Sequence, residues 1–238
     1  ESGAESVWFD LIGLTVDSLN VDGENSVFLH ENGRLIVPAP EEVFTAETTH
    51  HIEVYYSGHP TQDPYWGGVY FASEYIYHMG IGLTSIPPNY GKVWHPCFDN
   101  FVERATYTWN IRSAGGMKAH LQGTFLGETF EEGDTLIRSF TLEHPIPTHC
   151  AAFAVANYAD SNFVHTGEYG DIPVRLTAKP EDINQMVNKF TDIGYAIDAL
   201  EYWWGPYAWE RVGYVLTTEG ALEIPTNIAY PKFMIGES

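Results

Sequence analysis

Cysteine and basic residues are scarce in this 238-residue chain. Its two cysteines, Cys97 and Cys150, are too few for the disulfide framework that stabilises many small secreted domains, and we expect both thiols to be free and buried. Eleven Lys and Arg against 32 Asp and Glu give a formal charge of −21, which repels nucleic-acid phosphates and anionic membrane surfaces. The sequence therefore predicts no nucleic-acid partner.

Long apolar runs and targeting signals are missing as well. No run approaches the roughly 18–20 apolar residues that a membrane helix needs, so we predict no membrane span. No signal-peptide pattern follows Glu1, and we interpret this residue as a boundary left by processing or cloning. The compartment stays open between a cytoplasm and an exported location, periplasmic or extracellular, with a slight preference for export.

The common catalytic and metal-binding motifs are also lacking. There is no Gly-x-Ser-x-Gly elbow, no phosphate-cradling loop and no recognisable cysteine nucleophile. The acid pairs Glu41-Glu42 and Glu131-Glu132 fall in predicted turns, and His50-His51 in a solvated strand; His144 and His149 flank a proline-containing turn without ligand spacing. The residues alone predict neither a catalytic residue nor a metal ligand.

Short β-strands are the main positive signal. Aromatic residues make up 15% of the chain, and runs of alternating polarity are separated by turns roughly every 8–12 residues, which is typical of a sandwich. Asp22-Gly23 and Asn32-Gly33 are expected to form tight hairpin turns. The expected strands are 7–12, 17–21, 27–30, 34–37, 51–56, 104–111, 117–126, 135–142 and 151–158.

A helical pattern begins near residue 179. Lys179-Pro180-Glu181-Asp182 has the proline and acids of a helix start, and apolar residues then recur every three to four positions up to Leu200. We expect one amphipathic helix of about five to six turns. The predicted organisation is a β-sandwich domain over residues 1–160, and a linker helix with the first strands of a second domain over residues 161–238.

A candidate site lies after the β-rich run 212–218, in Gly220-Ala221-Leu222-Glu223-Ile224-Pro225. Small residues let another backbone approach closely, and Pro225 lacks an N–H, which favours the edge of a sheet. An edge strand can pair with an extended peptide, whose amino group the Glu223 carboxylate could hold. Taken without further context, an ordinary edge strand with a solvated Glu explains the residues better.

Three motifs in order resemble the aminopeptidase N-like zinc metallopeptidases, also called gluzincin aminopeptidases. Trp204-Gly205-Pro206-Tyr207 followed by Gly220-Ala221-Leu222-Glu223 is similar to that family's Phe-Gly-Pro-Tyr-Pro run and Gly-x-Met-Glu-Asn segment. His95-Pro96-Cys97-Phe98-Asp99 resembles its Pro-Cys-Phe-Asp motif, and residues 141–158 resemble the segment that closes its first domain. The resemblance covers most of the chain from about residue 80.

The resemblance implies a saddle-like antiparallel β-sandwich, followed by the opening of a thermolysin-like catalytic domain. It assigns substrate binding to Glu223, Ala221 and Gly220, with Glu223 pairing the substrate's α-ammonium group. Two positions depart from the family pattern: Pro87 stands where an amine-anchoring Gln or Glu is expected, and Ile224 stands where the family has Asn.

The zinc motif of that family, His-Glu-x-x-His on a helix, does not occur in this chain. His30-Glu31 begins it, but Arg34 occupies the position of the second histidine. We therefore expect no cofactor in this chain and zinc in the full-length protein, whose C-terminal catalytic domain and peptide substrate would be its partners. By itself the chain is expected to be inactive.

The alternative is a non-catalytic β-sandwich module that binds peptide or carbohydrate. The pattern favours exposure of Tyr65, Trp66, Tyr75 and Tyr77, which would suit stacking against sugars, although aromatic strand residues are more often part of a core.

Overall fold

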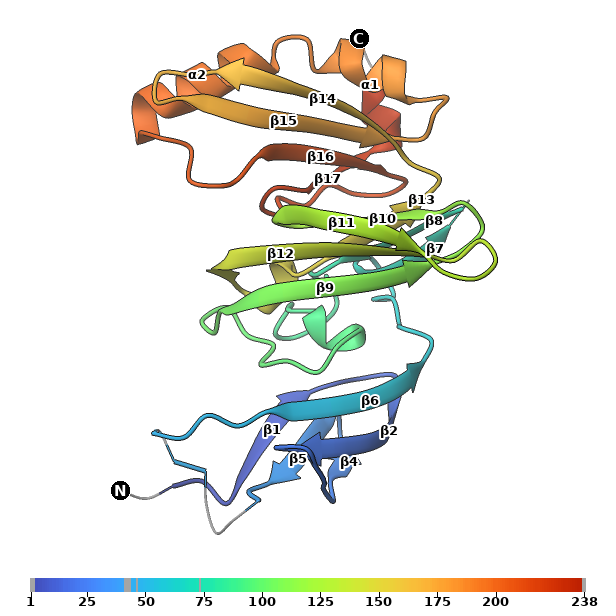
Figure 1. The fold of residues 1–238 in the computed structure, drawn as a ribbon, viewed down its shortest axis with the longest axis vertical. Helices are drawn as coiled ribbons and strands as arrows, with labels where there is room; N and C mark the ends of the chain where they lie inside the picture. Colours follow the sequence, from blue (N-terminus) through green and yellow to red (C-terminus); the bar gives the residue numbers. More distant parts are fainter. Residues whose placement is uncertain (1–2, 41–43, 46, 73, 237–238) are drawn as a thin grey trace. The chain divides into compact units, whose positions relative to one another are not determined.

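The computed structural model describes residues 3–40, 44–45, 47–72 and 74–236, so the acid pair Glu41-Glu42 lies outside the described residues (Figure 1). The chain divides into two compact units. The first unit contains Glu1–Val69, Met79–Arg104 and Pro147–His149, and the second contains Tyr70–His78, Ala105–Ile146 and Cys150–Ser238. Most of the described secondary structure is β, in sheets whose strands are mainly antiparallel, as the sequence predicts.

Two three-stranded sheets build the N-terminal part of the first unit. Their orders are β1-β5-β4 and β3-β2-β6. The strands are β1 (Ser6–Asp10), β2 (Leu14–Val21), β3 (Glu24–Asn25), β4 (Leu29–Glu31), β5 (Arg34–Pro38) and β6 (Ile52–Gly58). Alternation along β2 and β5, together with a bulge between Val16 and Ser18, turns Leu14, Val16, Leu19, Leu35 and Val37 into one core.

The two predicted hairpin turns of this unit are confirmed. Asp22 and Gly23 have φ of 54° and 87° between β2 and β3, and Asn32 and Gly33 have φ of 50° and 75° between β4 and β5. Positive φ at both central residues is the geometry whose twist matches that of the flanking strands, and Asn, Asp and Gly adopt it most readily.

The second unit contains a sheet of order β11-β12-β9 and most of one of order β10-β13-β8-β7. Its strands are β7 (Gly68–Ala72), β8 (Tyr75–Met79), β9 (Ala105–Ser113), β10 (Lys118–Leu121), β11 (Thr124–Phe130), β12 (Leu136–Ile146) and β13 (Phe153–Ala156). The single strand predicted over 117–126 is wrong. Gly123, at φ 77°, ends β10 and sends β11 into the other sheet, and a Cβ there would lie 1.9 Å from the Thr141 carbonyl oxygen.

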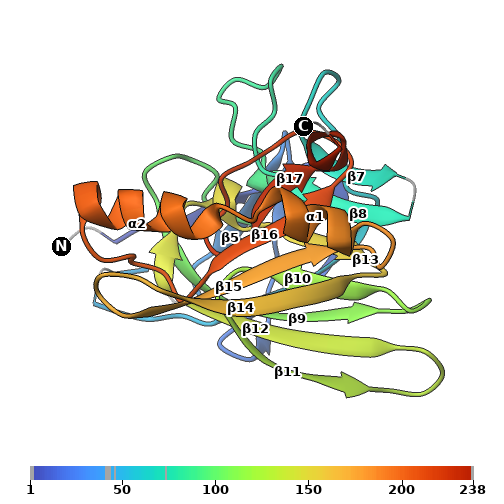
Figure 2. The same ribbon diagram turned by 90° about the horizontal axis from the view of Figure 1, so that it is seen from above.

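A mixed sheet of order β14-β15-β16-β17 completes the second unit. It consists of β14 (Ala159–Thr166), β15 (Asp171–Ala178), β16 (Val212–Thr217) and β17 (Ile228–Pro231), the last three of which pair in parallel. The helices α1 (Ile183–Lys189) and α2 (Ile193–Trp204) cover one face, where Met186 and Ile197 pack against the strands (Figures 1 and 2). The predicted domain boundary at residue 160 falls within β14 and stays a prediction.

The single long helix predicted from residue 179 is wrong, because the chain leaves the helix at Phe190. The Phe190 ring packs against Tyr214 and Tyr230, with centroids 4.4 and 5.1 Å apart, and Thr191 Oγ1 donates to the Asn188 carbonyl at 2.7 Å. Packing of a half-buried aromatic ring and capping of a helix C-terminus thus outweigh the helical period.

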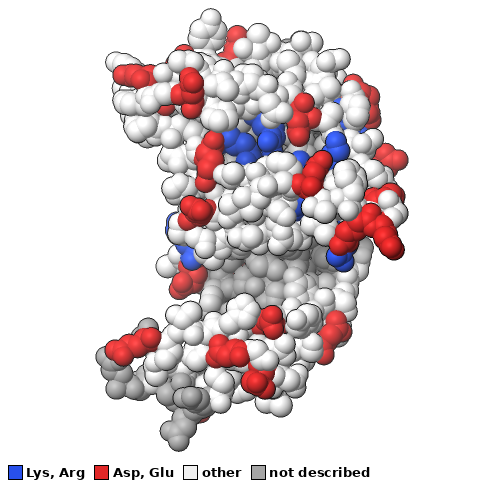
Figure 3. Space-filling view, viewed as in Figure 1, with Lys and Arg blue, Asp and Glu red and all other residues white. Residues whose placement is uncertain are grey.

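Acidic side chains are spread over the face drawn in Figure 3, without a single acidic tract. Among the helices of the described ranges, none has both the length and the apolar character needed to cross a bilayer.

Candidate functional site

The predicted peptide-binding segment follows β16. Gly220 has φ 68°, and Leu222 then pairs with Ala229 of β17 through N–H···O bonds of 3.3 and 3.1 Å. Since β17 is the last strand in the sheet order, Leu222 extends the sheet beyond it. A full edge strand over 220–225 does not form, because the Ile224 N–H turns back to the Leu222 carbonyl at 2.9 Å and ends the ladder.

Within this segment, Ala221 and Glu223 are exposed and Gly220 is half-buried. The Glu223 carboxylate has neither a hydrogen bond nor an ion pair with any residue in the described part of the chain. Ile224, which departs from the family pattern, is buried. The structure therefore leaves one uncompensated carboxylate beside the sheet edge, with an apolar anchor next to it.

Two buried tyrosines hold the beginning of this segment. Tyr77 Oη lies 2.8 Å from Thr218 Oγ1 and accepts the Glu219 backbone N–H at 3.0 Å, while Tyr158 donates to the Leu216 carbonyl at 2.7 Å. Burial raises the pKa of Tyr77 to about 12, so its hydroxyl stays neutral at pH 7. Sequence reasoning missed this role of Tyr77, because it depends on a contact between residues more than 140 positions apart.

The end of the segment is held by the β10–β11 turn. Gly123 donates its N–H to Thr226 Oγ1 at 2.7 Å, and Asn227 Nδ2 donates to the His120 carbonyl at 3.3 Å. Arg211, buried just before β16, donates to the Leu121 carbonyl at 2.8 Å and also to the Gly123 carbonyl. The exposed residues Ala221 and Glu223 thus lie between two fixed ends.

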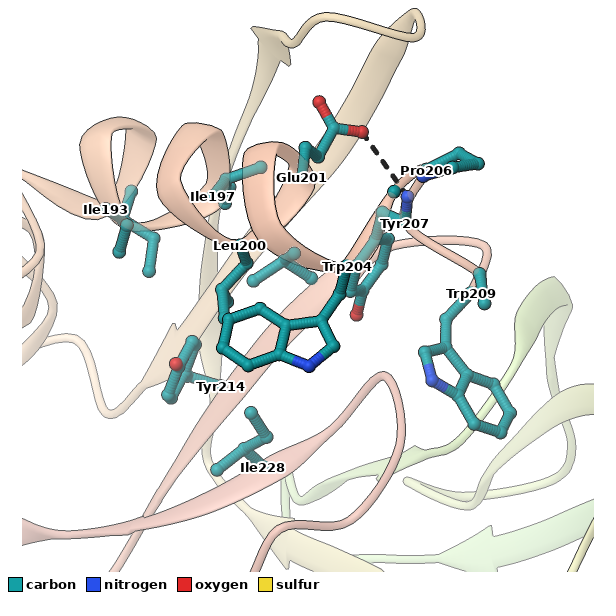
Figure 4. A pocket seen from close by; sticks show the side chains of 14 residues that line it. Ile193, Ile197, Leu200, Glu201, Trp204, Pro206, Tyr207, Trp209, Tyr214 and Ile228 are labelled. Atoms are coloured by element: carbon teal, nitrogen blue, oxygen red, sulfur yellow. Dashed lines mark hydrogen bonds between the residues drawn. The ribbon is translucent and has the colours of Figure 1, made fainter.

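Trp204-Gly205-Pro206-Tyr207 borders a pocket of about 370 Å³ (Figure 4). Figure 4 shows Leu200 and Trp204 of α2 facing Tyr214 and Ile228 of the sheet, with Tyr207 behind the indole. Glu201 borders the pocket but is turned away, and its Oε1 accepts the Tyr207 N–H at 3.3 Å. The pocket is therefore an apolar hollow, and Gly220, Ala221 and Glu223 do not line it.

The Pro96-Cys97-Phe98-Asp99 motif places two buried side chains, Cys97 and Asp99, in the first unit. The buried Asp99 carboxylate accepts Lys92 Nζ at 2.9 Å and Thr148 Oγ1 at 2.8 Å. Cys97 is free and buried as predicted, and burial raises the pKa of its thiol well above the ordinary value. Cys150 likewise forms no disulfide, but it is only half-buried, which corrects that part of the prediction.

Within the described residues, no three His, Cys, Asp or Glu side chains converge in a way that could hold a metal ion. His30 and Glu31 lie in β4, where His30 Nε2 is 3.0 Å from the Leu11 carbonyl oxygen. A strand places successive side chains on opposite faces, so this pair does not have the helical geometry of a zinc motif.

Two of the four aromatics considered for sugar stacking are core residues. Tyr75 and Tyr77 are buried, which corrects that part of the alternative. Tyr65 is exposed and lines, with Trp66 and Leu83, an open hollow of about 420 Å³ in the first unit.

Comparison with known proteins gives relatives of one kind, although no family model matches the chain. Human thyrotropin-releasing hormone-degrading ectoenzyme is 22% identical over 161 residues, which cover 66% of this chain and 14% of that protein. Mouse aminopeptidase B is 25% identical over 137 residues, which cover 58% of this chain and 19% of that protein.

Solved structures show the same fold. An M1 zinc metallopeptidase from Deinococcus radiodurans matches with a TM-score of 0.82 at 19% identity, over 98% of this chain and 53% of that one. Legionella pneumophila aminopeptidase A matches with a TM-score of 0.80 at 14% identity, over 97% of this chain and 27% of that one. The matches to the human ectoenzyme and to mouse aminopeptidase B cover a fifth or less of the length of those proteins. The expected resemblance is confirmed: in sequence and in fold, this chain is similar to the N-terminal region of the aminopeptidase N-like, or M1, zinc metallopeptidases.

Proposed function

We propose that this chain is the N-terminal portion of a zinc-dependent aminopeptidase and supplies its scaffold and the edge that receives the substrate's N-terminus. The division into a β-sandwich over residues 1–160 and the opening of a peptidase domain over residues 161–238 is part of the proposal. The observation that carries it is the exposed, unpaired Glu223 carboxylate on a segment fixed at both ends beside β17.

Peptide binding would use the backbone first. An extended substrate pairs with the backbone of Gly220 and Ala221 as an added strand, and its α-ammonium group meets Glu223. A charge-assisted contact of this kind contributes about 1.5–3 kcal/mol. Because only the first residue of a peptide carries an α-ammonium group, the contact would fix which bond is presented for cleavage.

Among the described residues, no three His, Cys, Asp or Glu side chains are grouped so that they could hold a metal ion. In the full-length protein, zinc would activate the water that attacks the peptide bond. We propose that its ligands lie in a C-terminal catalytic domain beyond this chain, and that this chain alone binds no catalytic zinc and hydrolyses nothing.

The first experiment compares zinc content and release of N-terminal residues for this chain and for one lengthened by about 200 residues of its reading frame, a span set by ordinary domain size. We expect one zinc per molecule and activity in the longer chain only. In that longer chain, Glu223→Gln should lower kcat/KM by about 10-fold or more, since the contact contributes about 1.5–3 kcal/mol. The exposed neighbour Glu219 provides the control, Glu219→Gln, with unchanged kcat/KM.

A reading frame that ends at residue 238, or a longer chain that is metal-free and inert, would overturn the proposal. The second candidate, a module that binds peptide or carbohydrate, would then lead, because Tyr65 and Trp66 line an open hollow. Loss of oligosaccharide or peptide binding in a Tyr65→Ala variant would test it.

A further inference from the structure

Helix α2 exposes large apolar side chains to solvent. The exposed fractions range from 54% for Leu200 to 78% for Trp204. At 100° per residue these side chains span more than half of the helix circumference. The residues of this aromatic face are Tyr195, Leu200, Tyr202, Trp203 and Trp204.

The two acidic side chains of α2, Asp198 and Glu201, lie outside the aromatic face, and each already has a partner. Glu201 is buried and accepts the Glu168 N–H at 2.9 Å, and Asp198 Oδ1 lies 2.6 Å from His165 Nε2 of β14. Among the residues of α2, Ile197 and Glu201 are therefore the buried ones, and the aromatic side chains stay in water together with Asp198. A helix that is apolar on most of its circumference is normally buried on most of it.

The pocket of Figure 4 continues the aromatic face. Leu200 and Trp204 belong to both, and the hollow extends from them to Tyr214 and Ile228 of the sheet. A contiguous apolar surface with a hollow at one end is the form of an interaction site, because monomeric proteins rarely leave such patches in water.

We propose that the aromatic face of α2 and its pocket are the docking surface for the polypeptide that follows residue 238 in the full-length protein. This inference rests on the proposed function and deepens it by assigning the surface through which the two parts of the peptidase domain join. An apolar side chain would fill the pocket beneath Trp204, and the rim of the incoming surface would be neutral or basic, because Asp192 and Asp198 lie exposed beside the aromatic face.

The length of the solved relatives favours this occupant over a separate protein. The structural match covers 98% of this chain but only 53% of the Deinococcus radiodurans metallopeptidase. That protein therefore contains about as much chain again outside the matched part. A covalently attached segment also reaches the surface at high effective concentration, which a free partner would have to match by affinity.

The test is the double variant Trp203→Asp, Trp204→Asp, made in this chain and in the chain lengthened by about 200 residues. Both indoles are more than 70% exposed, so the 238-residue chain should keep its urea midpoint. The longer variant should lose at least 10-fold in zinc retained after dialysis, and its α2 amides should exchange at least 10-fold faster than in the unsubstituted longer chain. Tyr65→Asp, at an equally exposed residue of the first unit, is the matched control and should change neither readout.

The outcomes separate this inference from the proposed function. If the unsubstituted longer chain binds zinc and the double variant matches it in zinc and exchange, the docking surface is wrong while the proposed function stands. If the unsubstituted longer chain is metal-free, the proposed function itself fails. If the 238-residue chain dimerises and the double variant makes it monomeric, the occupant is a second copy, which also overturns the inference.

Discussion

The Tyr77 hydroxyl accepts the backbone N–H of Glu219 at 3.0 Å, which ties strand β8 to the loop that carries the candidate site. The same oxygen lies 2.8 Å from Thr218 Oγ1. One neutral hydroxyl thereby holds the two residues that connect β16 to the segment from Gly220 to Glu223.

Tyr77→Phe should release this end of the segment. The variant loses two hydrogen bonds but keeps the ring, so we expect a loss of about 0.5–1.5 kcal/mol per bond in the free energy of unfolding. Urea denaturation measures the loss, and amide exchange at Glu219 should become faster. Tyr202→Phe, at an exposed ring, is the control and should leave both unchanged. Unchanged exchange at Glu219 in Tyr77→Phe would contradict the prediction.

Gly213→Ala should disturb the C-terminal end of the Glu223 segment, which Thr226 holds. A Cβ at this position would lie 1.9 Å from the Thr226 carbonyl oxygen, so the turn that binds Gly123 must move. Overpacking of this kind costs about 1–3 kcal/mol, which thermal or urea denaturation would show. Gly236→Ala, whose Cβ would have its nearest neighbour at 3.6 Å, should stay within about 0.5 kcal/mol of the parent. Equal stability of the two variants would refute the close approach.

Asp99→Asn should strongly destabilise the first unit. The buried carboxylate is the counter-charge of Lys92 and also accepts Thr148 Oγ1. Removal of one partner of a buried pair costs about 3–5 kcal/mol, because the other charge stays uncompensated. The exposed pair of Arg112 and Glu131 is the contrast, and Glu131→Gln should change stability by less than about 1 kcal/mol. A loss of less than about 1 kcal/mol in Asp99→Asn would contradict the prediction and show that water solvates the Lys92 ammonium group in place of the carboxylate.

Stability should fall as the pH drops below about 6.5, the ordinary pKa of histidine. Burial, followed by the positive charges of Arg138, Arg175, Arg211 and Lys118, holds the pKa of His120 well below 6.5. The unfolded chain then binds a proton that the folded chain does not, so acid favours unfolding, by up to about 1.4 kcal/mol per pH unit for one proton. The pKa of His149 is also lowered, mainly by burial, and adds in the same direction.

Urea denaturation between pH 7.5 and pH 5 tests this expectation. His120→Gln keeps an acceptor for Arg138, whose Nη1 lies 2.9 Å from His120 Nε2, and removes the titrating group. Its stability should depend less on pH than that of the parent. His59→Gln, at an exposed histidine, should keep the parent's pH dependence. An unchanged slope in His120→Gln would show that His120 does not supply the effect.

Local signals predicted much of the fold. Asp22-Gly23 and Asn32-Gly33 form the expected hairpins because positive φ is a property of those residues themselves. Alternation in β5 separates its buried residues from the others, since a strand has a period of two. The motifs around Asp99 and Glu223 predicted the family resemblance.

Other features depended on contacts between distant residues. Phe190 leaves the helix to reach Tyr214 and Tyr230, and Gly123 separates two strands because it lies against Thr141. Tyr77 looked like a binding aromatic and is instead a buried support of the candidate site. These contacts join residues that are far apart in the sequence, so a short stretch of sequence does not predict them.

Local patterns were therefore enough to predict the tight turns, many of the strands and the motifs behind the family resemblance, because each depends on residues within a few positions of one another. The acidic surface follows from composition. Tertiary structure decided where the helices break, which tyrosines are buried, and that the Glu223 segment is a single bridge held at both ends. It also decided that α2 turns its aromatic side chains outward. These outcomes follow from which surfaces meet, and burial and hydrogen bonding between distant parts of the chain outweigh local preference there.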